Sequence, residues 1–476
     1  MPFRIGPAPT ATPTPARIRS ARWGVLGLFA LLGAMLGTVF SRYPSIRDAL
    51  DVSVAGLANL VVIGSLGALA GLLVTGWSAA KFGTRALLWW SNLSFMAALA
   101  LVAGSTVAGS IPMFAVGQFF MSFSIAFTNV AMNAEAAIVE RQMGRAVMPQ
   151  FHATFSVGMA ISLAVGALMS YLDVAPVWHF LGMGLVLTVV RLVAVPFAAL
   201  DGMPDPAAAS AQLGGPFATA REAYSERRVL LIGVIVFCAS MTEMTAAQWM
   251  SIAVVDDFDR PEAMGTLMYW TFVVAMVSVR WFGAPILARL GRVVSLRAGA
   301  VCAALGLLTF AFTPVFWLVP VAAALWGMGA ALGVPIAFSA AADEPRGAAA
   351  RVAAVATFST VAGFVVPPLI GNLGDVISLQ FAFLVILVAS TTSFALARAV
   401  RKDGRLRGSR RAAERLVGSG RLSLESKEAP TADAPVADAA AVADAAAVAT
   451  GVAPVAPEDV DVPKDIDVPD GASGDR

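Results

Sequence analysis

The sequence predicts an all-α membrane protein whose twelve transmembrane helices form two pseudo-symmetric halves of six. Three features predict this fold class: the composition, the length of the apolar stretches and an internal repeat. Of the 476 residues, 58% are hydrophobic and 13% are charged, and the mean hydropathy is +0.77. A soluble domain carries about 25% charged residues. The composition therefore argues against a soluble enzyme, because water would meet too many apolar side chains.

Twelve stretches are long and apolar enough to cross a membrane. A bilayer core about 30 Å thick needs about 20 apolar residues in a helix. The expected spans are residues 23–40, 55–77, 86–107, 112–132, 155–172, 178–200, 229–254, 265–282, 294–312, 317–338, 353–370 and 381–399. The first span follows Arg17, Arg19 and Arg22, as in a secretory signal, but no small-residue cleavage site follows it. We therefore expect a retained first helix.

These spans divide the chain into five segments. They are a disordered cytoplasmic leader (1–21), a first six-helix bundle (22–200), a central cytoplasmic loop (201–228), a second six-helix bundle (229–400) and a cytoplasmic tail (401–476). The first part of the tail is basic, so it anchors the topology or lies on anionic membrane lipid. The second part is rich in Ala and Asp and has no aromatic residue after Ala429. It cannot bury enough apolar surface to offset its ordering entropy, so we expect disorder.

The distribution of positive charge predicts the orientation. With the amino terminus in the cytoplasm, the cytoplasmic loops carry 12 Lys and Arg residues and the outer loops carry 3. The opposite orientation would invert this bias. An even number of helices then returns the carboxyl terminus to the cytoplasm. We expect a multi-pass protein of the bacterial inner membrane with both termini in the cytoplasm.

The two halves of the chain echo each other. The segment Ala153–Ser156 recurs as Ala356–Ser359, 203 residues later, and the same offset takes Gly144 to Gly347. The glycines and basic residues after the second span are echoed near Gly283, Arg289, Gly291 and Arg292. Duplicated bundles are typical of transporters whose halves rock about a central site.

The loop after the second span carries the most specific motif. It reads Gly76-Trp77-Ser78-Ala79-Ala80-Lys81-Phe82-Gly83-Thr84-Arg85. This resembles the motif G-x-x-x-D-R/K-x-G-R/K-R/K of the major facilitator superfamily, with matches at Gly76, Lys81, Gly83 and Arg85. Ala80 replaces the acidic residue, which removes one expected charge partner at the cytoplasmic gate. The resemblance covers residues 23–399 and implies alternating access, with the four matching residues in gating.

Three further segments resemble a bacterial branch of that superfamily, grouped with fucose-permease-like carriers of mostly unassigned substrate. They lie at residues 129–158, 243–249 and 363–371. The branch usually has Asp where this chain has Asn129. Neither resemblance identifies a substrate.

Ionisable and amide side chains inside apolar spans are functional candidates, because an ionisable group in hydrocarbon costs at least about 2.5 kcal/mol. Glu243 lies midway along the seventh span, and we expect it to couple transport to protons; a static interhelical hydrogen bond is the alternative. Gln248 could bind a polar solute and Trp249 could stack on it. The resemblance also covers these residues.

The fourth span offers further candidates for substrate binding. Asn129 and Asn133 lie one turn apart on one helix face, and Asn129 either contacts the solute or pins a neighbouring helix. Phe123 belongs to a stripe with Phe119 and Phe127 that packs the bundle or lines a lipophilic site.

Charged residues near the cytoplasmic side are expected to form the gate or a structural ion pair. Arg280 could pair across the bundle with Glu135 or Glu140, and Glu135 is a gate acid or a solvated helix end. Arg191 is expected to snorkel to the inner surface.

The outer loops and the search for cofactor motifs give no further candidate site. The acidic run from Asp256 to Glu262 reads as a solvated turn, and Arg42 with Tyr43 as a plain helix end. No P-loop motif supports ATP drive, and no cofactor or metal is expected, because only two His and two Cys residues exist. The net charge of +2 suggests no nucleic-acid partner.

The sequence therefore predicts a monomeric, non-enzymatic secondary transporter of a small organic solute. Proton-coupled movement of a sugar-like or other polar metabolite is the leading hypothesis. Export of lipophilic or toxic compounds is the first alternative. A membrane sensor or scaffold that does not transport is the second.

Overall fold

The computed structural model describes residues 13–144, 147–200, 223–344 and 347–401. Within these residues the protein is helical, and twelve helices are long and apolar enough to cross a membrane. The predicted twelve spans are therefore confirmed. The expected central loop and tail lie largely outside the described residues. The expected disordered leader is wrong at its end, because the first helix already begins at Pro15.

The first half contains six spans and one short helix. The long spans lie in α1 (Pro15–Phe40), α3 (Val54–Ala108), α4 (Ile111–Met143), α5 (Met148–Tyr171) and α6 (Pro176–Ala198). The short helix α2 (Tyr43–Leu50) connects α1 to α3. Helix α3 holds two spans, Val54–Ala79 and Lys81–Ala108, which are joined at a sharp turn.

The second half repeats this plan. Its elements are α9 (Arg227–Asp256), α10 (Glu262–Trp281), α11 (Gly283–Phe312), η1 (Phe316–Leu318), α12 (Val319–Ala330), α13 (Gly333–Ala341), α14 (Ala348–Ile377), α15 (Leu379–Ala382), α16 (Val385–Leu396) and η2 (Ala397–Val400). The segments η1, α12 and α13 together form the tenth span, and α15, α16 and η2 form the twelfth.

The backbone confirms the internal repeat. Gly83 and Gly291, 208 residues apart, both break their helices with non-helical angles, φ +80° and ψ 157° against φ +72° and ψ 164°. Gly144 and Gly347 also share a positive φ, at +63° and +74°. These conformations disfavour residues with a Cβ. The same turns therefore recur at equivalent places in both halves.

Small residues determine how closely α3 and α4 pack. A Cβ built on Gly67 would lie 2.1 Å from the carbonyl oxygen of Phe119, and one on Gly71 would lie 2.8 Å from that of Phe123. Only glycine allows the two backbones to approach so closely. Membrane helices rely on such close packing because, inside lipid, no hydrophobic force drives helices together.

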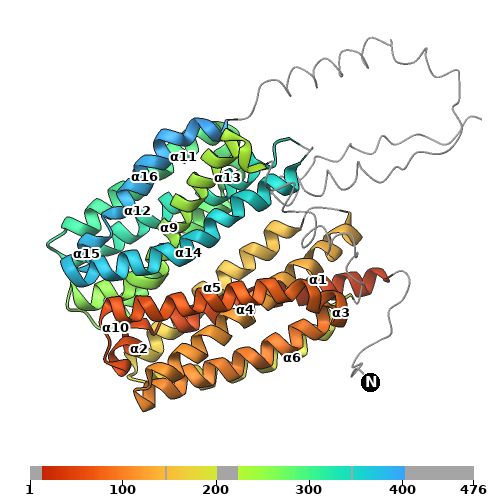
Figure 1. Cartoon of the computed structure of the whole chain (residues 1–476), viewed down its shortest axis with the longest axis horizontal. Helices are drawn as coiled ribbons and strands as arrows, with labels where there is room; N and C mark the ends of the chain where they lie inside the picture. The colour runs from red at the N-terminus through yellow and green to blue at the C-terminus, as the bar shows by residue number, and fades with distance from the viewer. Residues whose placement is uncertain (1–12, 145–146, 201–222, 345–346, 402–476) are drawn as a thin grey trace, which may run out of the picture.

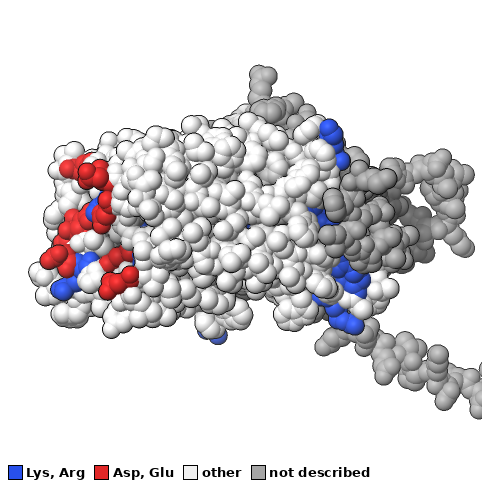
Figure 2. Space-filling model, turned by 90° about the horizontal axis from the view of Figure 1, so that it is seen from below, with Lys and Arg blue, Asp and Glu red and all other residues white. Residues whose placement is uncertain are grey.

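The two halves meet at one end of the molecule and diverge toward the other (Figure 1). We call the first the α2 end and the second the Gly83 end. Helix α3 packs on α14, where the Ser65 hydroxyl donates to the Gly363 carbonyl at 2.9 Å. Helix α5 packs on α10, where the Tyr269 hydroxyl lies 3.7 Å from the Met159 sulfur. Figure 2 shows charged side chains gathered at both ends: acidic groups together with some Lys or Arg at the α2 end, and Lys and Arg at the Gly83 end.

Candidate functional site

A cavity of about 150 Å³ lies between the halves. Most of its wall comes from α1, α3 and α4, and α9 contributes one side chain, Gln248. The polar residues in this wall are Tyr43, Ser65, Gln118, Ser122 and Gln248. Apolar walls with a few convergent polar groups are typical of small-molecule sites.

Two amides face this cavity with unused hydrogen-bonding capacity. The side-chain oxygens of Gln118 and Gln248 are buried and have no partner among the described residues. A buried carbonyl oxygen without a partner costs free energy that a hydroxyl group of a solute would recover. The structure therefore brings the predicted Gln248 together with Gln118, which the sequence analysis did not select.

Glu243 forms an ion pair with Arg280 of the neighbouring helix α10. Arg280 also donates from Nε to the Ala331 carbonyl at 2.9 Å. The side chains of Glu243 and Arg280 are 27% and 29% exposed. The partner of Arg280 thus differs from the expected Glu135 or Glu140: the ion pair joins two helices of the same half.

Asn129 lies on the cavity face of α4 but closer to the Gly83 end. It follows Gln118 and Ser122 at helical spacing, and it is exposed. Asn133 donates to its side-chain oxygen at 2.7 Å. The two asparagines therefore bind each other, as the shared face predicts, and leave the Asn129 amide group available.

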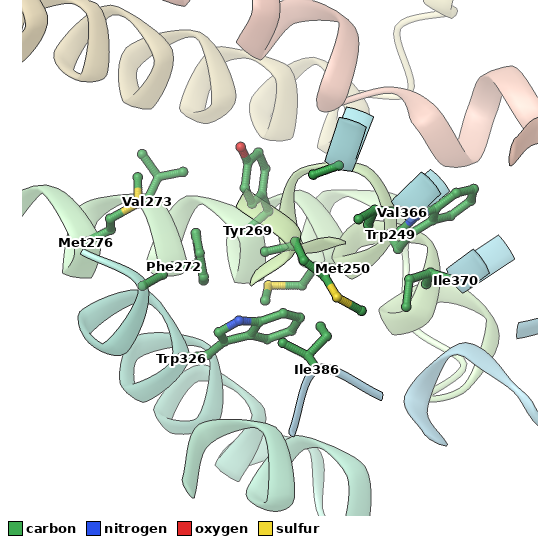
Figure 3. Packing of buried hydrophobic residues seen from close by; sticks show 14 of the residues in the cluster. Trp249, Met250, Tyr269, Phe272, Val273, Met276, Trp326, Val366, Ile370 and Ile386 are labelled. Carbon is green, nitrogen blue, oxygen red and sulfur yellow. The ribbon is translucent and has the colours of Figure 1, made fainter. Parts of the chain in front are cut away.

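Trp249 and Phe123 pack instead of lining the cavity. Trp249 is completely buried, and Figure 3 shows it beside Val366 and Ile370 of α14. Phe123 stacks on Phe127 with ring centroids 4.6 Å apart. Neither ring lines this cavity. Solute binding by Trp249, and by Phe123, for which packing is the stated alternative, stays a prediction.

Glu135 holds the loop at the Gly83 end. It is fully buried. It accepts a hydrogen bond from the Thr84 hydroxyl and one from the backbone N–H of Leu200 at 3.0 Å. Glu135 therefore ties the turn at Gly83 to the end of α6 within one half.

The four residues that match the superfamily motif lie at or near the turn at Gly83. Gly83 makes the turn itself, and Arg85 is half-buried two residues later. Lys81 is exposed, and its ammonium lies over the ring of Trp77 at 4.8 Å. Gly76 lies within the last turns of the preceding span.

The second half has a contact equivalent to that of Glu135 with Thr84, which the sequence did not predict. We call these two contacts the braces. Arg292 follows Gly291 and donates to the carboxylate of Asp343 at 2.8 Å, and Arg228 donates to the same group at 2.8 Å. Arg292 and Asp343 each lie 208 residues after Thr84 and Glu135. Extending the repeat to these positions could have predicted this pair.

The α2 end is closed by bonds between the halves. Glu262 forms an ion pair with Arg42 at 3.1 Å. It accepts hydrogen bonds from the backbone N–H and hydroxyl of Ser45 at 2.8 and 2.6 Å and from the Ser170 hydroxyl at 3.0 Å. Arg47 pairs with Asp256. We call these contacts the latch. The acidic run is therefore not a solvated turn, and Arg42 is not a plain helix end.

Electrostatics keeps the latch charged. Burial lowers the pKa of Arg42, and the Glu262 carboxylate opposes that fall. Burial also tends to lower the pKa of Arg47, but the bonds to Asp256 and Asp48 outweigh it and raise that pKa overall. Both guanidinium groups therefore stay protonated at neutral pH.

Arg191 is buried inside the first half and does not snorkel. Its guanidinium contacts the Met35 sulfur at 3.1 Å and the Thr128 hydroxyl at 3.0 Å. In the described part of the chain, no cluster of three or more His, Cys, Asp or Glu side chains could hold a metal ion.

Comparison with known proteins gives consistent matches. The family model described as Major Facilitator Superfamily matches residues 23–367. A relative from Sinorhizobium fredii, named uncharacterized transporter y4wD, is 28% identical over 366 residues, which cover 76% of this chain and 93% of that protein.

Two solved structures show the same fold. The nucleoside transporter NupG matches with a TM-score of 0.65 and 14% identity over 81% of this chain and 100% of that one. The E. coli fucose:proton symporter FucP matches with a TM-score of 0.57 and 15% identity over 80% of this chain and 98% of that one.

Proposed function

Because the chain belongs to the Major Facilitator Superfamily, we propose that it is a secondary active transporter that moves a small polar organic solute by alternating access. We place it in the bacterial inner membrane with the Gly83 end and both termini in the cytoplasm. The Lys and Arg side chains at that end (Figure 2) favour this orientation.

The cavity between the halves is the observation that carries the proposal. It lies where two pseudo-symmetric bundles meet, and polar side chains of the first half converge there with the Gln248 amide of the second. The latch joins the halves at the α2 end, so the structure is closed at that end, which is the outer side in the orientation proposed here. Rocking of the halves would then expose the same groups to either side of the membrane.

Proton coupling is assigned to Glu243. When ionised, its carboxylate is held by Arg280. Protonation removes the charge that holds Arg280, so the guanidinium is freed to bind elsewhere or to move. Partial exposure of both side chains gives water a route for the proton. The pair can therefore link protonation to a change in helix contacts, as coupled carriers require.

A proteoliposome assay tests this coupling. A thermal-shift screen of metabolites first identifies a solute, whose uptake is then measured with and without an imposed pH gradient. We expect Glu243→Gln to lose accumulation against a gradient while it keeps exchange of solute across the membrane, because the amide cannot release a proton. Glu344→Gln is the matched control, since Glu344 is half exposed and pairs with Arg351. Normal uphill transport by Glu243→Gln would refute the proton role.

Export of lipophilic compounds receives less support. Its main argument was the phenylalanine stripe of α4. Gly67 and Gly71 lie against the backbone of Phe119 and Phe123, so this part of α4 serves the packing against α3. The cavity is lined by Phe40 and Tyr43 but not by the α4 stripe, and the amides of Gln118 and Gln248 in its wall favour a solute with polar groups.

A further inference from the structure

Arg191 is a positive charge buried in the first half with only neutral partners. Its side chain is fully buried. One guanidinium nitrogen contacts the Met35 sulfur and another contacts the Thr128 hydroxyl, which itself donates to Ser91 at 2.9 Å. The Nε atom is buried without a partner among the described residues.

This arrangement differs from that of three other arginines among the described residues. Arg42, Arg280 and Arg292 each pair with a carboxylate. A buried cation without a counter-charge is costly, and proteins normally pair such groups. The described residues supply no carboxylate to Arg191, and an anionic group of a bound solute would neutralise it.

Met35 links Arg191 to the cavity. Its sulfur contacts the guanidinium, and its side chain also lines the cavity between the halves. One flexible side chain therefore separates the buried charge from the space assigned to the solute. Methionine adapts its shape readily because it has three rotatable bonds and no branch.

Arg191 differs from Arg280, whose charge is neutralised by Glu243. No ion pair of Arg191 is found among the described residues, and its guanidinium contacts only neutral groups. We propose that Arg191 receives a carboxylate or other anionic group of the transported solute when the Met35 side chain moves aside. This inference rests on the proposed transport function and narrows its substrate class to anionic solutes.

A charge-selective labelling experiment tests this assignment without knowledge of the solute. In full-length protein carrying Cys238→Ser and Cys302→Ser, the cavity residue Ser122 is changed to cysteine. Its reaction rates with a negatively charged and a positively charged methanethiosulfonate reagent are compared. With Arg191 present, we expect the ratio of anionic to cationic rates to be at least about tenfold higher than in Arg191→Gln.

Two variants sharpen the comparison. Arg191→Lys keeps the charge and should keep most of the ratio, which a purely structural role would not predict. A Met35→Cys reporter lies closer to the guanidinium and should show a larger effect than the reporter at position 122. Equal ratios in the Arg191 and Arg191→Gln proteins, at both reporter positions, would overturn the proposal.

Chloride distinguishes a solute group from a free inorganic anion. The labelling ratio is measured in about 150 mM sodium chloride and in the sodium salt of a bulky buffer anion at equal ionic strength. A ratio that persists in chloride supports a site reserved for the solute. A ratio that chloride alone abolishes would assign the site to an inorganic ion and overturn the solute assignment. Labelling needs no transport, so failure of proton coupling at Glu243 would leave this result unaffected.

Discussion

The latch at the α2 end offers the sharpest test of how the halves move. Glu262 of α10 contacts three residues of the other half: it forms an ion pair with Arg42 and accepts hydrogen bonds from Ser45 and Ser170. Opening toward that end must break all of them. Changing Glu262 to alanine removes the shared acceptor and should shift the protein from the state described here toward a state open at the α2 end.

The size of this shift follows from burial. The side chains of Arg42 and Glu262 are only 4% and 12% exposed. Breaking a buried ion pair by removing one partner costs about 3–5 kcal/mol. We take about 3 kcal/mol, because these groups lie near the end of the bundle and regain water when it opens. Since 1.4 kcal/mol is a factor of ten, the conformational equilibrium should move by about 100-fold.

Distances between spin labels measure this equilibrium directly. Labels at Ala108→Cys and Val315→Cys would report on the two halves at the α2 end, in protein whose native cysteines are changed to serine. A protein that is almost wholly closed at this end should become a mixture in Glu262→Ala, with a second, longer distance clearly populated.

The control removes a charge from the same loop without touching the other half. The guanidinium of Arg260 lies over the ring of Phe316 at 5.0 Å, within the second half. Arg260→Ala should therefore keep the single short distance. If Glu262→Ala gave the same distribution as Arg260→Ala, the latch would not govern opening and the reasoning above would fail.

Two further substitutions test packing and the braces. Gly67→Val places side-chain carbon against the Phe119 carbonyl and should destabilise the fold by about 3 kcal/mol, which thermal unfolding in detergent checks; Gly27→Val, where nothing lies within 4 Å, should melt like the parent protein. Asp343→Asn leaves two arginines without their shared carboxylate and should cost about 3 kcal/mol; a melting temperature equal to that of Glu344→Gln would contradict the brace.

The fold could be predicted from the sequence because its cause is local. A helix of about 20 apolar residues is the main way to satisfy backbone hydrogen bonds in lipid. Each span can therefore be recognised from its length and composition alone. The segment α11 is broken at Gly291, and its longer part follows that break, close to the expected start at Val294. The polar residues around the turn at Gly291 belong to helix ends and not to a loop.

The candidate site was only partly predictable, because pairing between helices is a tertiary property. Glu243 was selected for its charge in an apolar span, but nothing local indicates Arg280 as its partner. Asp256 and Glu262 read as loop residues, since their partners Arg42 and Arg47 lie some 200 residues earlier in the chain.

A latch at one end gives the carrier unequal faces. A solute arriving at the Gly83 side meets a molecule already in the receptive shape. A solute arriving at the α2 side can bind only to the small fraction of molecules that are open at that end. Its apparent dissociation constant is therefore the intrinsic constant divided by that fraction. Two half-saturation concentrations, one for each side of the membrane, would then differ for the same binding groups. The ion pairs at the rim, which never touch the cargo, would set that difference.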